Sequence, residues 1–119
     1  MAQKSVLLVE DDPDIQSLVE ALLASEGIPV RIADDAEQAL QEIRREKPAL
    51  MLVDLTLPGI TGGDLSTQVK REFGSDIRVV IMSAGRDLGA TVRETGADDF
   101  LAKPFEVEDL IDKVKQWLS

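Results

Sequence analysis

The sequence contains no cysteine and no histidine. The absence of cysteine excludes disulfide bonds, thiolate nucleophiles and sulfur-ligated metals. The absence of histidine removes the most common general base and the most common zinc ligand. Any chemistry in this chain must therefore be carried out by carboxylates, lysine, serine, threonine and the backbone.

Basic residues are also few, since 13 lysines and arginines stand against 23 aspartates and glutamates and give a formal net charge of −10. Such a surface repels phosphate backbones and anionic lipids, so we expect no direct binding to nucleic acids or membranes. The opening residues, MAQKSVLLVEDD, become acidic after four apolar positions, which fits neither a signal peptide nor a membrane span. We therefore expect a cytoplasmic protein.

The chain has the size of one domain, with 119 residues of which 44% are hydrophobic and 30% charged. Five short apolar runs recur along it, at Val6–Val9, Val30–Ala33, Leu50–Val53, Val79–Met82 and Phe100–Ala102. They mostly lack polar alternation, which is typical of strands buried on both faces of a parallel sheet. We expect a single domain, residues 1–119, built on such a sheet.

Segments with helical spacing lie between and after these runs. Apolar residues three and four apart mark four helices, at Ile15, Leu18, Val19, Leu22 and Leu23, at Ala36, Ala39, Leu40 and Ile43, at Leu65, Val69 and Phe73, and at Val107, Leu110, Ile111, Val114 and Leu118. Asp12 and Pro13 predict the start of the first helix, and Gly27 its end. Between Gly85 and Gly96 apolar residues are few, so we expect a short, poorly formed or mobile helix there.

The alternation of strands and helices predicts an α/β fold with a (βα)₅ pattern. Right-handed crossovers place helices on both faces, which makes a doubly wound open parallel sheet. Ligands of such folds bind outside the carboxyl ends of the strands, where the strand order reverses. The residues that follow each apolar run are therefore the candidates for function.

The side chains that are candidates for chemistry follow four of the five runs. Glu10 and Asp11 follow the first, Asp54 the third, Ser83 the fourth and Lys103 the fifth. Carboxylates gathered at one edge repel each other unless a cation lies among them, and a hard, oxygen-preferring ion such as Mg²⁺ fits. Singly, each residue has an ordinary role as a cap, turn residue or surface charge. Together they favour phosphoryl transfer onto Asp54, with Lys103 and Ser83 contacting the phosphoryl oxygens.

Four stretches carry a family resemblance: VLLVEDDPDI, LMLVDLTLPGITGGDL, VVIMSA and GADDFLAKPF. In this order and spacing they resemble the response regulator receiver domains of bacterial two-component systems, over essentially the whole chain. The resemblance implies a flavodoxin-like sheet with strand order 2-1-3-4-5. It also implies a signalling switch and not an enzyme, because such a domain catalyses only its own phosphorylation and dephosphorylation.

The resemblance assigns roles around the phosphorylated residue, which is Asp54. It implies a Mg²⁺ site in which Asp11 is a direct ligand and Glu10 acts mainly through water. Asp54 itself and the backbone carbonyl of Thr56 are the remaining protein ligands. Asp12 aligns one place beyond the acidic pair, which agrees with its predicted role as a helix cap.

The resemblance also implies the switch. The hydroxyl of Ser83 would move toward the phosphoryl group, the ammonium of Lys103 would pair with it, and the rotamer of Phe100 would follow. The Lys103–Pro104 peptide bond would be cis, which is accessible because the penalty is low only before proline. We expect Lys103 to be exposed and to contribute little to stability.

The implied phosphodonor is a histidine kinase or a histidine phosphotransfer protein, and the implied target is an effector domain or a separate protein. The domain would be a monomer or a phosphorylation-dependent dimer. A degenerate receiver that works unphosphorylated as a protein-interaction module stays open as an alternative. The reason is the segment Gly85–Thr95, which at 11 residues is shorter than usual and lacks the regular apolar spacing of the family's fourth helix.

The motifs that other functions of this fold require are absent from the sequence. A flavodoxin-like FMN binder needs a phosphate loop rich in serine, threonine and glycine after the first strand, where this chain has EDDPD. A dinucleotide-binding oxidoreductase needs a glycine-rich turn at the same place. A phosphatase with a carboxylate nucleophile would have a second acid two residues after Asp54, where this chain has Thr56.

Overall fold

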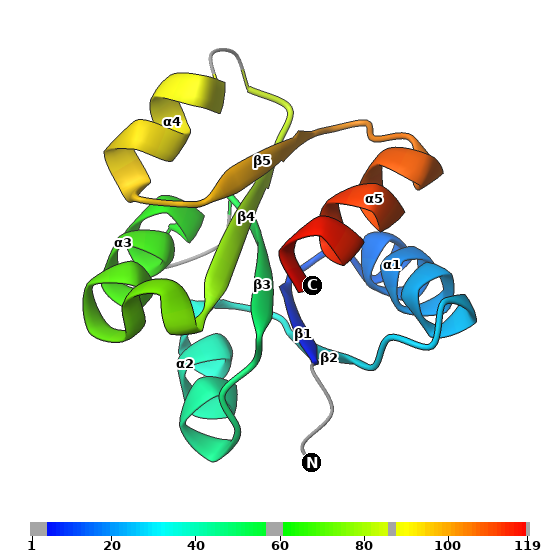
Figure 1. Ribbon diagram of the computed structural model, residues 1–119, viewed down its shortest axis with the longest axis horizontal. Coiled ribbons are helices and arrows are strands. Elements are labelled where there is room, and N and C mark those ends of the chain that lie inside the picture. The colour runs from blue at the N-terminus through cyan, green and yellow to red at the C-terminus, as the bar shows by residue number, and fades with distance from the viewer. Residues whose placement is uncertain (1–4, 57–60, 86–87, 119) are drawn as a thin grey trace.

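The structure, a computed structural model, describes residues 5–56, 61–85 and 88–118. Within these ranges one parallel sheet is formed by β1 (Val6–Val9), β2 (Val30–Ala33), β3 (Leu50–Asp54), β4 (Arg78–Ser83) and β5 (Asp99–Ala102). The strand order is β2-β1-β3-β4-β5, so the predicted doubly wound sheet and its order are confirmed (Figure 1).

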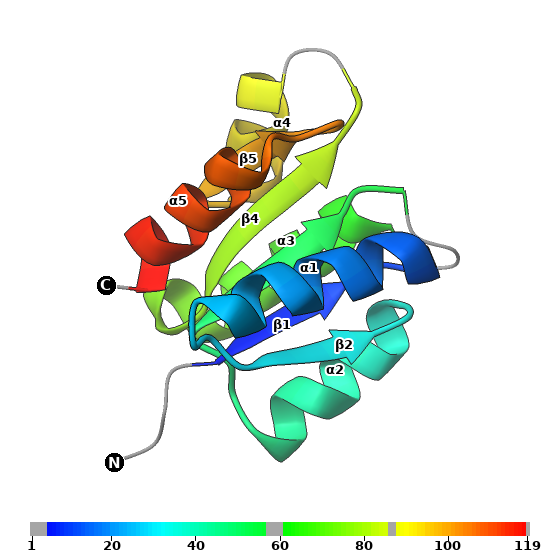
Figure 2. The same cartoon turned by 90° about the vertical axis from the view of Figure 1, so that its right-hand side faces the viewer.

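Helices cover both faces of the sheet (Figure 2). They are α1 (Pro13–Ser25), α2 (Ala36–Arg45), α3 (Gly62–Phe73), α4 (Leu88–Thr95) and α5 (Val107–Leu118), and a short 3₁₀ helix, η1 (Gly74–Asp76), follows α3. One hydrophobic core joins the sheet to α1 and α5, and the other joins it to α2 and α3. None of the helices in the described ranges is both long and apolar enough to span a membrane.

The first helix has the predicted ends. The Asp12 carboxylate accepts a hydrogen bond from the backbone N–H of Asp14 at 2.9 Å, and Pro13 occupies the first helical position. Gly27, two residues past the end of α1, has φ +74°, a conformation in which a side chain would be strained. Leu18, grouped by its spacing with the apolar face, is 47% exposed.

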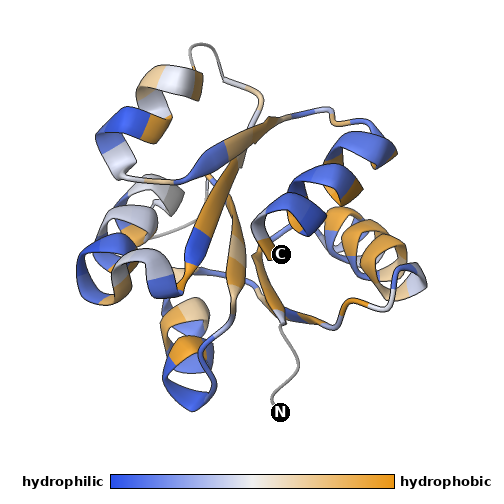
Figure 3. Ribbon diagram, viewed as in Figure 1, coloured by the Kyte–Doolittle hydropathy of each residue, from blue (hydrophilic) through white to orange (hydrophobic). Residues whose placement is uncertain are grey.

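The inner strands β1, β3 and β4, which are mostly apolar in Figure 3, are buried on both faces as predicted, whereas the edge strands β2 and β5 are only partly buried. Two of the inner strands extend further than predicted at the carboxyl end. Asp54 is the last residue of β3 and pairs with Met82, and Ser83 is the last residue of β4 and pairs with Ala102. Both functional candidates therefore have strand backbones, which fix them more firmly than loop positions would.

The segment predicted as a short helix contains one, α4, with eight residues. Its buried residue is Leu88, and the carbonyl oxygen of its last residue, Thr95, accepts hydrogen bonds from the hydroxyls of Ser66 and Thr67 on α3. Residues 86 and 87 of the predicted segment lie outside the described ranges. The expectation that α4 is mobile stays a prediction.

Candidate functional site

The site lies at the carboxyl edge of the sheet, where residues from three strand ends meet. Glu10 follows β1, Asp54 ends β3 and Lys103 follows β5. The backbone N–H of Lys103 donates to the carbonyl of Ser83 at 2.9 Å, which continues the pairing of β5 with β4. From there its Nζ reaches Glu10 Oε1 at 3.0 Å and Asp54 Oδ2 at 3.5 Å.

Three carboxyl groups form the acidic part of the site. Glu10, Asp11 and Asp54 each offer an oxygen, and these oxygens all lie within 4.8 Å of one another. Glu10 is 1% exposed and Asp54 5%, whereas Asp11 faces solvent. The Oε2 of Glu10 is buried and has no hydrogen-bond partner among the described residues. An unpartnered carboxylate oxygen beside two further carboxylates could hold a metal ion.

Burial sets the protonation of Glu10. Loss of water raises its pKa to about 7, and a hydrogen bond shared with Asp54 adds to this rise, against the opposing effect of Lys103. Two carboxyl groups so close cannot both be ionised at low cost, so at neutral pH the pair shares a proton part of the time.

Asp54 is the ionised member of the pair. Burial acts to raise its pKa, but the hydrogen bond from the Glu10 carboxyl, the N–H of Thr56 and the charge of Lys103 outweigh that effect and hold the pKa below its usual range. The backbone N–H and the hydroxyl of Thr56 donate to Asp54 Oδ1 at 3.1 and 3.2 Å. Asp54 is therefore an anionic carboxylate held in place, as a nucleophile requires.

Ser83 is close to this cluster but directed elsewhere. Its side chain is buried, and its Oγ accepts a hydrogen bond from the backbone N–H of Gly85 at 2.9 Å. Phe100 is half-buried on β5, beside α5. The peptide bond between Lys103 and Pro104 is cis.

The expectation that Lys103 is an exposed lysine is wrong, because its side chain is 18% exposed and packs against buried carboxylates. Sequence spacing gave no warning of this, since the contact with Glu10 joins residues 93 positions apart. The role of the Thr56 carbonyl as a metal ligand stays a prediction, because the contacts found for Thr56 are those of its N–H and hydroxyl.

Sequence reasoning also missed Gln16, whose side chain links the backbone of Glu10 to Asp34. The Gln16 side-chain amide donates to the carbonyl oxygen of Glu10 at 2.5 Å and to Asp34 Oδ1 at 2.7 Å. It ties the loop after β1 to the loop after β2, and thereby fixes the backbone next to Asp11. No pattern in the sequence distinguished Gln16 from the other polar residues of α1.

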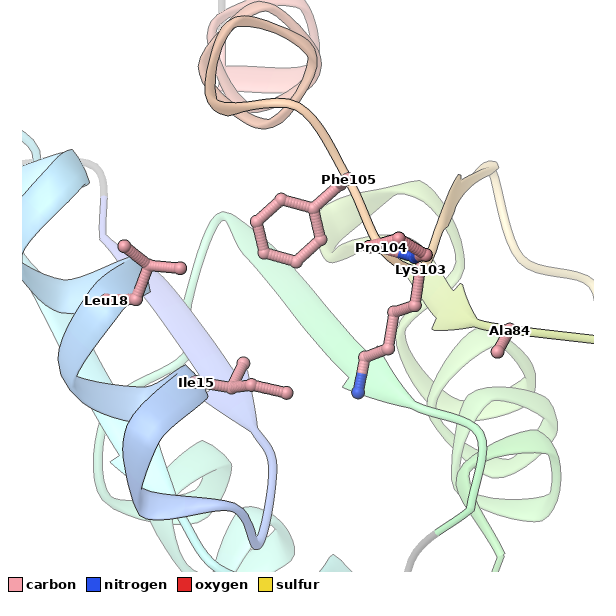
Figure 4. Close-up of a pocket in the computed structure, with 6 residues that line it drawn as sticks. All are labelled: Ile15, Leu18, Ala84, Lys103, Pro104 and Phe105. Carbon is pink, nitrogen blue, oxygen red and sulfur yellow. The ribbon is translucent and has the colours of Figure 1, made fainter.

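An apolar groove of about 390 Å³ adjoins the site (Figure 4). Ile15 and Leu18 of α1 line one side, and Pro104 and Phe105 of the loop after β5 line the other. The Lys103 side chain forms its end next to the carboxylates. An exposed apolar surface of this kind beside a charged site is typical of an interaction surface.

Fold and site together define a doubly wound α/β protein with a carboxylate cluster and a paired lysine at its carboxyl edge. Residues 6–115 match the sequence family described as "Response regulator receiver domain". Relatives include the DNA-binding response regulator MtrA of Mycolicibacterium smegmatis, 33% identical over 95% of this chain and 50% of its own length. The phosphate regulon transcriptional regulatory protein PhoB of Pseudomonas aeruginosa is 32% identical over 97% of this chain and 52% of its own length.

Solved structures give the same result. The receiver domain of NtrX from Brucella abortus is 34% identical, with a TM-score of 0.86 over 96% of this chain and 98% of that one. A CheY-like response regulator receiver domain protein from Methanospirillum hungatei is 28% identical, with a TM-score of 0.90 over 98% and 94%. The chain therefore belongs to the response regulator receiver domain family, a signalling family. It spans about half the length of the curated relatives it matches.

Proposed function

We propose that this receiver domain is a phosphoacceptor, in which Asp54 receives a phosphoryl group from a histidine kinase or a histidine phosphotransfer protein. The observation that supports it is the convergence of Asp54 with Glu10, Asp11 and Lys103 at one strand edge. A cation 3.5 Å from an ionised aspartate, beside a set of carboxylates that could hold a metal, is the arrangement that phosphoryl transfer to a carboxylate needs.

The metal we propose is Mg²⁺, because the available ligands are carboxylate and carbonyl oxygens. The unpartnered Oε2 of Glu10 supports the fit. Asp11 and Asp54 would be direct ligands, Glu10 would act mainly through water, and the carbonyl of Thr56 would complete the protein ligands. When bound, Mg²⁺ neutralises charge on the phosphoryl oxygens.

The residues of the chain account for the rest of the reaction. An Asp54 oxygen forms a bond to phosphorus as the bond between phosphorus and the imidazole nitrogen of the donor breaks, and the electron pair leaves with that nitrogen. Thr56 restrains the nucleophile through its two hydrogen bonds. The Lys103 ammonium, freed from part of its pairing with Glu10, stabilises the charge that develops on the phosphoryl oxygens. Hydrolysis of the acyl phosphate returns the domain to its first state.

The donor is proposed to dock in the apolar groove between α1 and the loop after β5. Ile15, Leu18 and Phe105 offer an apolar surface whose end is Lys103, so a partner bound there has its phosphohistidine next to Asp54. The exposed Leu18 is part of a continuous apolar groove, and a surface of this kind is typical of an interaction site. The acidic chain, of net charge −10, favours a partner with a basic rim.

The output is proposed to follow from Ser83. Its hydroxyl leaves the N–H of Gly85 to contact the phosphoryl group, and this movement changes the loop after β4 and the rotamer of Phe100. The changed surface around α4, β5 and α5 would act on an effector domain or a target protein. A DNA-binding output, as the name of the relative MtrA indicates for that protein, is one such effector.

The test is intact-mass spectrometry after incubation with acetyl phosphate. We expect one added phosphoryl group in the presence of Mg²⁺, and none when the metal is removed by chelation. Asp54→Asn is nearly isosteric and should give no adduct under any condition. Absence of an adduct in the folded wild-type protein would contradict the proposal and favour a module that binds partners unphosphorylated.

The pKa of Glu10 predicts how metal binding depends on pH. Because this pKa is about 7, we expect Mg²⁺ affinity measured by calorimetry to be about tenfold weaker at pH 6 than at pH 8. Glu10→Gln removes the titrating group, so its affinity should vary much less over this range. Equal wild-type affinity at both pH values would show that a proton on Glu10 does not compete with the metal.

The raised pKa of Glu10 also makes the stability of the metal-free protein depend on pH. The folded pKa of Glu10 lies above the ordinary value of 4.5, so the folded chain binds more protons than the unfolded chain between the two. The free energy of unfolding should therefore fall as pH rises from about 4.5 to about 7 through this group. Mg²⁺ should reverse the trend, because it stabilises the ionised carboxylates.

A further inference from the structure

Phe100 lies at the open edge of the sheet and belongs to neither hydrophobic core of the described residues. In the register of β4 and β5 it pairs with Ile81, which is buried in the core under α2 and α3. Residues paired in this way point to the same face of a sheet. The ring nevertheless contacts α5, which covers the opposite face, because the Lys113 Nζ is 5.3 Å from its centroid. The ring is therefore turned outward over the edge of β5.

Lys113 is held in this position by Asp99. Its Nζ lies 2.7 Å from Asp99 Oδ1, and the other oxygen of Asp99 accepts a hydrogen bond from the indole N–H of Trp117 at 2.9 Å. The backbone N–H of Phe100 donates to Asp99 Oδ1 at 2.8 Å. Burial acts to raise the pKa of Asp99, but the hydrogen bonds from Lys113 and Trp117 outweigh it and lower the pKa. The carboxylate therefore stays charged and anchors the ammonium over the ring.

We propose that Lys113 is a positioning residue, which restrains Phe100 in its outward rotamer and so favours the unphosphorylated state. The inference rests on the proposed function, in which Ser83 moves toward Asp54. Ser83 is two residues beyond Ile81 on β4, so both side chains lie on the same face of the sheet as the Cβ of Phe100. Movement of the Ser83 side chain toward Asp54 therefore opens space on that face. Rotation of the ring into that space breaks its contact with the ammonium of Lys113 on α5, which stays paired with Asp99.

The test measures binding of beryllofluoride with Mg²⁺, which mimics a phosphoryl group on a carboxylate without a chemical step. Lys113→Met removes the charge and retains most of the side-chain length. We expect this variant to bind the probe roughly threefold to tenfold more tightly than wild type, because the resting state loses a cation–π contact. Lys113→Gln should act in the same direction, and Lys113→Arg, which keeps the charge over the ring, should restore wild-type affinity.

Lys115 provides a matched control on the same helix. It pairs with Glu26 at the far side of α5 and touches neither Phe100 nor Asp99, so Lys115→Met should leave the affinity for beryllofluoride unchanged. Trp117 adds a spectroscopic readout, since it is the one tryptophan of the chain. Its emission should change when beryllofluoride binds, because the Phe100 ring then leaves the Lys113 ammonium, which shares Asp99 with the Trp117 indole. Phe100→Ala should still bind the probe but lose this change.

Two outcomes would overturn the proposal and can be told apart. Unchanged affinity in Lys113→Met and Lys113→Gln, with normal binding by wild type, would refute the role of Lys113 and leave phosphorylation of Asp54 intact. Absence of binding by the folded wild-type protein would refute the proposed function together with this inference.

Discussion

Replacing Lys103 with alanine is expected to slow phosphorylation of Asp54 by acetyl phosphate at least about 100-fold, the usual cost of losing one donor to a developing oxyanion. The Lys103 Nζ is 3.5 Å from Asp54 Oδ2, close enough to follow the phosphoryl oxygens as their charge develops. Its removal also leaves the buried Glu10 without its cation at 3.0 Å. The rate should be measured by intact mass at saturating Mg²⁺, which keeps the carboxylates neutralised and the domain folded.

Two control variants separate the position of the charge from its presence. Lys103→Arg keeps the charge but changes its shape, so we expect a rate between those of wild type and Lys103→Ala. Lys47, an exposed lysine paired with Asp76, tests the general effect of losing one positive charge, and Lys47→Ala should phosphorylate at the wild-type rate. If Lys103→Ala also matched wild type, the charge-stabilising role of Lys103 would be wrong.

The largest loss of stability is expected from Asp98→Ala. Asp98 is 15% exposed, and its Oδ2 accepts hydrogen bonds from Lys70 Nζ at 2.9 Å and from the backbone N–H of Val79 at 2.8 Å. The substitution leaves a half-buried ammonium without its counter-charge and an N–H without its acceptor. We expect a loss of about 3 kcal/mol in the free energy of unfolding, measured by urea denaturation.

An exposed ion pair of the same chain provides the comparison. Lys47 and Asp76 lie 3.3 Å apart with side chains 49% and 66% exposed, so Asp76→Ala should cost less than about 0.5 kcal/mol. Lys70→Met combined with Asp98→Ala should recover part of the loss, because the largely buried Lys70 ammonium is then no longer left without its counter-charge. Equal effects of Asp98→Ala and Asp76→Ala would show that burial of the Lys70–Asp98 pair contributes nothing.

The strands and helices follow closely from local pattern. The apolar runs predicted all five strands to within one residue at either end, because strands in a parallel sheet covered by helices consist mostly of apolar residues. Asp12, Pro13 and Gly27 predicted the ends of α1 through backbone requirements that act within a few residues. The extra strand residue at Asp54 was missed because pairing with the next strand, and not hydrophobicity, sets where a strand ends.

The membership of the site also follows from the sequence. Once the runs are taken as parallel strands, Glu10, Asp11, Asp54 and Lys103 must come to one edge, and the structure brings them together. Their electrostatic state does not follow. The pKa of Glu10 depends on how completely neighbouring segments exclude water from it, and this is a property of packing.

By itself, then, the sequence determined the order of the strands along the chain, the helix ends and the set of residues at the carboxyl edge. Only the tertiary structure decided which of those side chains touch. Lys103 reaches Glu10 across 93 positions, and Lys113 holds the ring of Phe100 outside the core. Local sequence fixes the backbone direction of a residue, but its rotamer and protonation depend on side chains from distant segments, which meet only when the sheet and its helices are assembled.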